Sequence, residues 1–354
     1  MKSDFDSRAG SVWPADELET LAACPLCGAK GRHLIHKDLR DNTFFVAPGL
    51  WTLWRCEACN CGYLDPRPTR ASIHRAYARY YTHDAPFESA PPRTWLQKIR
   101  TALANGYRNR RYGARLAPSA SIGFYIARLV PPLARPSDIQ YRFLSLANRA
   151  NQKRRLLDVG CGAGRFLADA REAGWEVAGV DFDPVAVENA KKRGLDVHLG
   201  GLEQFEHEHS IFDAVTMSHV IEHMHDPRQA LVRIFDLLKP GGAAYIETPN
   251  LDSIGHQLYQ SNWRGLEPPR HLVLFNGPAL RSLLAETGYE KIRFWRPLPQ
   301  LGGIGLLSAR IAAGRDPNDH SDESVAGPSL WNRMRSAVSI MRNEFLVITA
   351  RKPD

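Results

Sequence analysis

The chain has 354 residues, of which 44% are hydrophobic and 24% charged, and it carries a formal net charge of +8 at pH 7. This length and apolar content suit one large folded domain beside a smaller one. No stretch approaches the roughly 18 unbroken apolar residues of a membrane span, and the first ten residues lack the apolar core of a signal peptide, so we expect a cytoplasmic protein.

Two cysteine pairs with CxxC spacing follow a polar, aperiodic tail over residues 1–20. The first pair is Cys24 and Cys27, and the second is Cys56 and Cys59. Such pairs form tight turns that direct two thiolates toward one ion, so we expect a zinc ribbon over residues 21–75 that holds a structural Zn²⁺.

The alternative to a zinc site is that the four cysteines bind no metal and are free thiols of a protein in a reducing compartment. Cys61 adjoins the second pair and is a spare thiol on the ribbon interpretation, whereas His33 and His36 are weaker substitutes as ligands.

The next segment, residues 76–152, is strongly basic. From residue 86 to residue 155 the sequence has fourteen Lys and Arg against two acidic residues. Trp95, Ile99 and Leu103 recur at helical spacing among these cations, so we expect a basic helical linker or cap.

This basic segment has more than one interpretation. Its apolar face can pack on the catalytic domain while its arginines are solvated. Alternatively, residues 93–155 contact an anionic membrane surface, at the inner face of the membrane, or RNA as a runner-up. We predict no stable protein partner.

A glycine-rich turn follows the first buried strand, at about residues 155–159. Gly160, Gly162 and Gly164 leave this turn without Cβ atoms. Backbone N–H groups can therefore approach a ligand closely, and a helix can begin at Arg165.

Six more strands are expected after this turn, at about residues 176–181, 195–199, 211–217, 243–247, 291–296 and 344–350. Strands that alternate with helices over short connections predict a doubly wound α/β sheet. The second strand ends in Asp181, near the offset at which an acidic residue meets a ribose hydroxyl. An insertion at about 301–342 precedes the last strand, with loop composition in its middle and helical spacing at its end.

The glycine turn reads GxGxG after Asp158 and resembles motif I of the class I S-adenosylmethionine (SAM) methyltransferases. The resemblance continues in VDFDPVAVENAKKRG after the second strand, GLEQF after the third, FDAVTMSHVIEHMHDP at the fourth and LLKPGGAAYIETPN at the fifth. The ribbon followed by YLDPRPT is similar to a subset of small-molecule methyltransferases. The resemblance implies a Rossmann-like seven-stranded sheet in a SAM-binding domain over residues 153–354, with the last strand antiparallel beside the fifth.

The resemblance also implies which residues bind SAM. They are Asp158, Gly160, Cys161, Gly162 and Gly164 beside the methionine part, Asp181 at the ribose, Phe182, Gly201 and Leu202 at the adenine, and Ser218 and His219 beneath the methionine. Asp183 suits the N-cap of the next helix better than Asp181 does, which leaves Asp181 for the ligand.

Catalytic candidates follow the fourth strand. His219, Glu222 and His223 are spaced so that one helical turn would place them on one face, where a base for an acidic hydroxyl is needed. Their HxxEH spelling also occurs in inverted zinc peptidases, which we reject because the motif follows a strand inside a methyltransferase series. His271, in a long loop after the fifth strand, is the runner-up base; the alternative is a histidine that is hydrogen-bonded to the loop backbone.

A divalent ion near Glu222 and His223 is implied by a further resemblance, to the ubiquinone-type O-methyltransferases. His219 stands where that group has an acidic residue, and imidazole suits softer metals than Mg²⁺. The alternative is that Glu222 and His223 only fix the loop by hydrogen bonds.

These observations lead to one functional hypothesis and two alternatives. We expect SAM-dependent methyl transfer to a small-molecule, sugar or lipid-linked acceptor, at oxygen. The alternatives are an RNA methyltransferase that uses the ribbon and the basic segment, and a non-catalytic SAM-binding interaction module.

Overall fold

The computed structural model describes residues 12–78, 94–144, 154–319 and 324–354. The predicted tail up to residue 11, the basic segment at 79–93 and 145–153, and part of the predicted loop at 320–323 lie outside the described residues. The chain folds into two compact units. The first unit comprises residues 1–80, 218–235 and 246–350, and the second comprises residues 81–217, 236–245 and 351–354.

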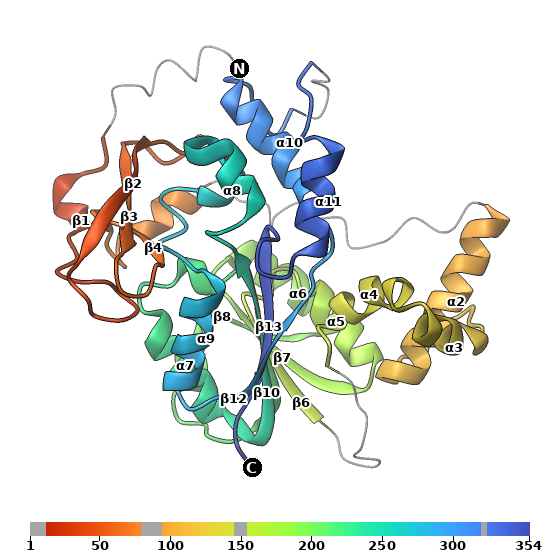
Figure 1. Ribbon diagram of the computed structural model, residues 1–354. Helices are drawn as coiled ribbons and strands as arrows, with labels where there is room; N and C mark the ends of the chain where they lie inside the picture. Colours follow the sequence, from red (N-terminus) through yellow and green to blue (C-terminus); the bar gives the residue numbers. More distant parts are fainter. Residues whose placement is uncertain (1–11, 79–93, 145–153, 320–323) are drawn as a thin grey trace. The chain divides into compact units, whose positions relative to one another are not determined.

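Within the described residues, seven strands form one sheet in the order β8-β7-β6-β9-β10-β13-β12 (Figure 1). They are β6 (Arg154–Val159), β7 (Trp175–Asp181), β8 (Asp196–Leu199), β9 (Phe212–Ser218), β10 (Leu238–Pro249), β12 (Glu290–Trp295) and β13 (Phe345–Arg351). β6 pairs in parallel with β7 and with β9, and β7 pairs in parallel with β8. The Rossmann-like seven-stranded sheet is confirmed, and so is the place of the last strand, because β13 lies between β10 and β12.

The strand boundaries follow the apolar runs of the sequence. Leu156 and Leu157 in β6 are fully buried, as expected for a strand with neighbours on both sides and helices on both faces. β10 is the exception, because it begins at Leu238, five residues before the prediction. The carbonyl oxygen of Gly242 accepts the N–H of Lys352 at 3.0 Å, so the glycines of the preceding turn join the pairing with the chain end.

The second unit also contains helices α2 (Trp95–Tyr112), α3 (Ile122–Leu129), α4 (Pro131–Gln140), α5 (Arg165–Glu172) and α6 (Pro184–Lys192). α2 begins at a capping box, in which the side chains of Thr94 and Gln97 each accept the other's backbone N–H. α2 and α3 cross closely, since a Cβ atom on Gly123 would lie 2.0 Å from the carbonyl oxygen of Leu103. Only glycine fits at this crossing.

A second sheet, in the first unit, has the order β11-β4-β3-β2. Its strands are β2 (Arg32–Leu39), β3 (Trp51–Cys56), β4 (Gly62–Leu64) and β11 (Val273–Leu274), and β1 (Leu18–Glu19) pairs separately with β5 (Arg67–Pro68). In the β2–β3 hairpin, Arg32 pairs with Cys56 at one end and Leu39 with Trp51 at the other. Because β11 pairs with β4, the sheet that carries the cysteine pairs also includes residues from the second half of the chain.

The remaining helices are α7 (Pro227–Leu237), α8 (Ile254–Tyr259), α9 (Gly277–Glu286), α10 (Leu301–Ala312) and α11 (Leu330–Val338). α11 confirms the helical end predicted for the insertion, whereas α10 was not predicted, because its three glycines lower the intrinsic helix propensity. Packing explains one of them, since a Cβ atom on Gly305 would lie 2.7 Å from the ring of Pro328. None of the helices described here combines the length and the apolar character needed to cross a membrane.

Candidate functional site

The glycine turn after β6 requires glycine for conformational reasons. Gly160, Gly162 and Gly164 have φ angles of 71°, 53° and 80°, which are left-handed values that residues with a Cβ atom rarely adopt. Gly164 is also limited by space, since an added Cβ atom would lie 2.3 Å from Cδ1 of Leu195. Within the turn, the N–H groups of Gly160 and Cys161 donate to the carbonyl oxygen of Val180 at 2.8 and 3.1 Å, and that of Gly164 donates to the carbonyl oxygen of Cys161 at 3.0 Å.

Two aspartates frame this turn. The buried carboxylate of Asp158 accepts the hydroxyl of Thr216 at 2.6 Å and pairs with Arg142. At the end of β7, the carboxylate of Asp181 accepts the N–H of Gly162 at 2.7 Å and the N–H of Asp183 at 2.9 Å. Burial raises the pKa of Asp181. As predicted, the side chain of Asp183 caps α6, where it accepts the N–H groups of Val185 and Ala186.

The other predicted SAM residues in the second unit fall into buried and exposed positions. Phe182 is 77% exposed, and a Cβ atom on Gly201 would lie 2.9 Å from its ring, so ring and glycine are neighbours. Leu202 begins a short 3-10 turn next to Gly201. Cys161 is buried, and burial raises the pKa of its thiol. Ser218, the last residue of β9, belongs to the first unit.

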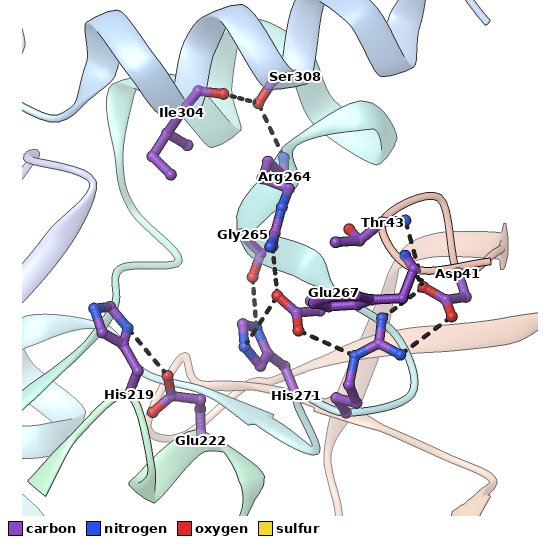
Figure 2. Close-up of polar contacts among 12 residues, drawn as sticks. Asp41, Thr43, His219, Glu222, Arg264, Gly265, Glu267, His271, Ile304 and Ser308 are labelled. Atoms are coloured by element: carbon purple, nitrogen blue, oxygen red, sulfur yellow. Dashed lines mark hydrogen bonds and ion pairs between the residues drawn. The ribbon is translucent and has the colours of Figure 1, made fainter. Parts of the chain in front are cut away.

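Glu222 is the buried carboxylate of a polar cluster in the first unit (Figure 2). Thr248 donates its hydroxyl to Oε2 of Glu222 at 2.9 Å. Oε1 receives no hydrogen bond from the described residues, and Nδ1 of His219 lies 3.5 Å from it. The side chain of His219 is 40% exposed whereas that of Glu222 is 0% exposed, so only the histidine of this pair is accessible.

The predicted helical turn over His219, Glu222 and His223 is wrong for its first member. The 3-10 turn spans Ile221–His223, and His219 precedes it with a left-handed φ of 57°. Strand β9 is extended up to Ser218, and the left-handed conformation of His219 lies between this strand and the turn. His219 therefore does not share a helical turn with Glu222 and His223.

His223 and His271 each place Nδ1 beside a backbone carbonyl oxygen. Nδ1 of His223 lies 3.0 Å from the carbonyl oxygen of Arg270, and Nδ1 of His271 lies 2.8 Å from the carbonyl oxygen of Gly265. A carbonyl can only accept, so each Nδ1 carries a hydrogen and each Nε2 of the neutral rings keeps a lone pair. Nδ1 of His223 is also 3.0 Å from the hydroxyl of Tyr77.

Glu222, His223 and His271 form a candidate metal-binding group. Each offers one ligand atom, and the three atoms lie within 4.8 Å of one another. Two imidazoles and one carboxylate suit transition metals better than Mg²⁺. The structure thus groups His271, the runner-up base of the sequence, with Glu222 and His223, and His219 is not a member of this group.

The cluster has perturbed proton affinities. Burial lowers the pKa of His271 to about 4. Burial acts to raise the pKa of Glu222, but the neighbouring rings of His219, His223 and His271 lower it to about 2. For His219, removal from water acts to lower the pKa, and the carboxylates of Glu222 and Glu247 outweigh it, so its pKa is raised.

The loop that carries His271 is held by buried ion pairs (Figure 2). Glu267 pairs with Arg264 and with Nε of Arg270, and it lies 3.8 Å from Nε2 of His271. Burial acts to raise the pKa of Glu267, and the two arginines and His271 lower it well below its usual range. Sequence reasoning missed Glu267, because acidic residues beside arginines are common in solvated loops.

Helix α10 of the insertion contacts the same loop. The N–H of Arg264 donates to the hydroxyl of Ser308 at 3.0 Å, and this hydroxyl donates to the carbonyl oxygen of Ile304 at 2.7 Å (Figure 2). Through α10 the insertion therefore supports the loop that carries His271.

The four predicted ligands of the ribbon come together. The Sγ atoms of Cys24, Cys27, Cys56 and Cys59 lie within 4.8 Å of one another. Hydrogen bonds from Cys59 and Cys61 lower the pKa of Cys24, which favours a thiolate. Thiolates in a cluster of four are the donor set of structural zinc sites.

The spare thiol and the substitute histidines lie outside this group of four. Cys61 is fully buried, with its Sγ 3.4 Å from the Sγ atoms of both Cys24 and Cys59. Nε2 of His36 lies 2.9 Å from Nε2 of His256, in a different part of the first unit, and His33 is exposed.

The seven-stranded sheet and the glycine turn after β6 are typical of a Rossmann-like methyltransferase domain, and a family profile matches this part of the chain. The profile of the family described as "Methyltransferase domain" matches residues 134–293. This segment is therefore a methyltransferase domain, and the resemblance to the class I SAM-dependent methyltransferases is confirmed.

Curated relatives include several enzymes named ubiquinone biosynthesis O-methyltransferase. The protein from Cronobacter sakazakii is 29% identical over 56% of this chain and 76% of its own length. The mitochondrial protein from Schizosaccharomyces pombe is 34% identical over 27% of this chain and 38% of its own length, and that from Aromatoleum aromaticum is 32% identical over 27% and 44%. The chain thus spans less than half the length of most of the first relatives that it matches.

Among solved structures, a SAM-dependent methyltransferase from Thermotoga maritima, described as a possible histamine N-methyltransferase, is 22% identical, with a TM-score of 0.41. The similarity covers 65% of this chain and 94% of that one. A SAM-dependent methyltransferase from Archaeoglobus fulgidus is 19% identical, with a TM-score of 0.42 over 64% of this chain and 94% of that one.

Proposed function

We propose that the protein transfers a methyl group from SAM to an oxygen atom of a small-molecule, sugar or lipid-linked acceptor. The observation that carries this proposal is the glycine turn after β6, whose Gly162 N–H meets the carboxylate of Asp181 at the end of β7. This arrangement suits a ribose and an amino-acid moiety at the carboxyl ends of parallel strands. The relatives named ubiquinone biosynthesis O-methyltransferase favour oxygen as the accepting atom.

In this proposal each predicted SAM residue keeps its role. Asp181 accepts the ribose hydroxyls, the exposed ring of Phe182 packs on the adenine beside Gly201 and Leu202, and Asp158 orders the turn from behind. The backbone of Gly160, Cys161, Gly162 and Gly164 lines the methionine part, and Ser218 and His219 follow β9.

SAM supplies an electrophilic methyl group bound to a sulfonium, and S-adenosylhomocysteine leaves as a neutral thioether when the methyl group is transferred. The residues of this chain then have to orient the acceptor oxygen, exclude water and take one proton. We assign the proton to Nε2 of His219, because its ring is accessible and Glu222 behind Nδ1 can stabilise the imidazolium. Glu222 is thus a positioning residue for this base.

We further propose that Glu222, His223 and His271 hold a divalent transition metal. Two imidazoles and one carboxylate offer ligand atoms within 4.8 Å of one another, and Oε1 of Glu222 receives no hydrogen bond from the described residues, so a cation between these groups would satisfy all three. The hydrogen bonds at both Nδ1 atoms fix the rings for this purpose, as carbonyl partners do for metal-binding histidines. The bound metal would stabilise negative charge on an acceptor oxygen.

For the ribbon, we propose that Cys24, Cys27, Cys56 and Cys59 bind a structural Zn²⁺, with a closed set of thiolate ligands. The predicted cytoplasmic location stays a prediction.

Calorimetric titration with SAM and S-adenosylhomocysteine tests the cofactor, and transfer of labelled methyl groups to metabolite and lipid extracts tests the reaction. Micromolar binding of both nucleosides and labelling of a small molecule are the expected results. Absence of binding would exclude the proposed cofactor site. Binding without transfer to any extract would favour the interaction module, and labelling of RNA would favour the other alternative, for which the named relatives give no support.

Three variants separate the proposed roles of the cluster. His271→Gln should remove the visible Co²⁺ absorption of this site and leave that of the ribbon, while His219→Gln should keep both and lose methyl transfer. Glu222→Gln should lose the Co²⁺ absorption of this site and methyl transfer. Equal Co²⁺ spectra in all three variants would show that no metal binds at this group.

A further inference from the structure

Two helical segments outside the sheet expose apolar side chains in stripes. One lies on α2 and α3 in the second unit, and the other lies on α11 in the first. Isolated apolar residues are ordinary on protein surfaces, whereas contiguous exposed stripes mark surfaces that meet a partner or a membrane. Methyl transfer requires neither stripe.

On α2 the exposed apolar residues are Trp95, Leu96 and Ile99, in a stretch where every residue from 94 to 100 is exposed. On α3 the exposed apolar residues are Ile122, Tyr125 and Leu129, which lie within about 60° of one another at 100° per residue. Leu129 is 83% exposed, while Gly123 and Ala127 on the opposite side of α3 are buried.

α11 repeats this pattern at the end of the insertion. Its exposed apolar residues are Leu330, Trp331, Met334 and Val338, within about 100° of helix surface. Trp331 is 66% exposed, and Ser336 on the inner side is fully buried. α11 is thus an amphipathic helix whose apolar side faces solvent.

The charges around both stripes have one sign. From residue 94 to residue 140 there are eight Lys and Arg, and the single acidic residue, Asp138, accepts the hydroxyls of Tyr107 and Tyr112. From residue 325 to residue 343 the sequence has three arginines and no acidic residue. The guanidinium of Arg110 lies 5.4 Å from the ring of Tyr125, so cations adjoin the apolar stripe itself.

We propose that the stripes of α2, α3 and α11 bind an anionic phospholipid surface. Apolar side chains between cations are the pattern of helices that lie in the headgroup region, where chains bury the apolar stripe and headgroups attract the cations. RNA would satisfy the cations but would leave aliphatic residues such as Leu129 and Leu330 exposed. A second copy of the chain would bring like charges together, which opposes pairing of these faces.

Sedimentation with lipid vesicles tests this surface on the full-length protein. We expect binding to vesicles that contain phosphatidylglycerol and little binding to pure phosphatidylcholine, with a decrease as salt rises. Ile122→Glu with Leu129→Glu, and Trp331→Glu with Met334→Glu, should each weaken binding by about tenfold or more, because each pair places two charges in the apolar layer. Val232→Glu, in α7, replaces a comparably exposed apolar residue outside the stripes and should bind as the wild type does.

Several results would overturn the proposal. These are equal binding to both kinds of vesicle, double variants that bind as tightly as the control, and a wild-type dimer in gel filtration that the double variants convert to a monomer. Tight binding of a polyuridine probe that the glutamate variants retain would assign the cations to RNA instead. Titration with S-adenosylhomocysteine on the same variants checks folding, and failure of that titration in the wild type would refute the proposed methyl transfer without touching this surface.

Discussion

The guanidinium of Arg270 and the carboxylate of Asp41 form a fully buried, two-pronged ion pair between positions 229 residues apart in the sequence. Asp41 lies in the connection between β2 and β3, and it also accepts the N–H groups of Val46 and Ala47, both at 3.0 Å. Arg270 directly precedes His271, and its carbonyl oxygen lies 3.0 Å from Nδ1 of His223. The hairpin of the ribbon therefore fixes the loop that positions two histidines of the candidate site.

Asp41→Asn should lower the free energy of unfolding by about 3–5 kcal/mol. The substitution leaves the guanidinium of Arg270 buried with only Glu267 as a counter-charge, and breaking one partner of a buried pair is costly because the other charge cannot regain its hydration. Urea unfolding, followed by tryptophan fluorescence, measures the change.

Glu286→Gln is the matched control for this measurement. It breaks the pair between Arg228 and Glu286, which is exposed on both sides, and should cost less than about 1 kcal/mol. If Asp41→Asn costs no more than Glu286→Gln, the ribbon does not support the loop through Arg270.

Asp181→Ala should weaken binding of S-adenosylhomocysteine by about 1–3 kcal/mol, the loss expected when hydrogen bonds to a buried carboxylate are removed. Asp183→Ala removes the cap of α6 and should reduce stability while the affinity stays near the wild-type value. Calorimetric titration of both variants with S-adenosylhomocysteine measures these affinities. Unchanged affinity in Asp181→Ala would mean that the ribose binds elsewhere.

The sequence was sufficient for the sheet and insufficient for the loop behind the site. Strands are recognised from short apolar runs, and six of the seven strands of the large sheet begin within one residue of the prediction. β10 starts earlier, because its glycines pair with the chain end and not because of any apolar pattern. The glycine turn and the cap by Asp183 were also predictable, since they depend on local backbone geometry.

Contacts between distant positions were out of reach of the sequence. His271 was predicted as the runner-up base, but its grouping with Glu222 and His223 depends on the fold of a loop about 50 residues later in the chain. Neither Asp41 nor Glu267 has a local signature that distinguishes it from a solvated acidic residue. Strand β11 has two residues, too few for any periodicity.

Cys56→Ser should release the ribbon metal. Cys56 is one of the four clustered thiols and is fully buried at the end of β3, so a hydroxyl in its place removes a thiolate ligand and leaves an incomplete set. The zinc content of the purified protein should fall by about one ion per chain, as measured by a colorimetric chelator, and the unfolding midpoint should fall with it.

Cys61→Ser is the informative control, because Cys61 is equally buried and touches Cys24 and Cys59 without belonging to the group of four. Retention of zinc in Cys61→Ser and loss in Cys56→Ser is the expected pair of results. The reverse result would assign Cys61 as a ligand.

The buried pair of His36 and His256 should make the protein less stable in mild acid. Burial lowers the pKa of His36 to about 4, against an ordinary value near 6.5, and burial also lowers the pKa of His256. Between pH 6.5 and pH 4 the unfolded chain therefore binds more protons than the folded one, so the free energy of unfolding falls as the pH falls through this range. From pH 7 to pH 5, His36 alone should account for a loss of about 2 kcal/mol in the free energy of unfolding.

Urea unfolding at pH 7 and pH 5 should give a smaller loss of stability for His36→Phe than for the wild type. His207→Phe, at an exposed site, should lose as much as the wild type does. An unchanged loss in His36→Phe would place the acid sensitivity elsewhere in the fold.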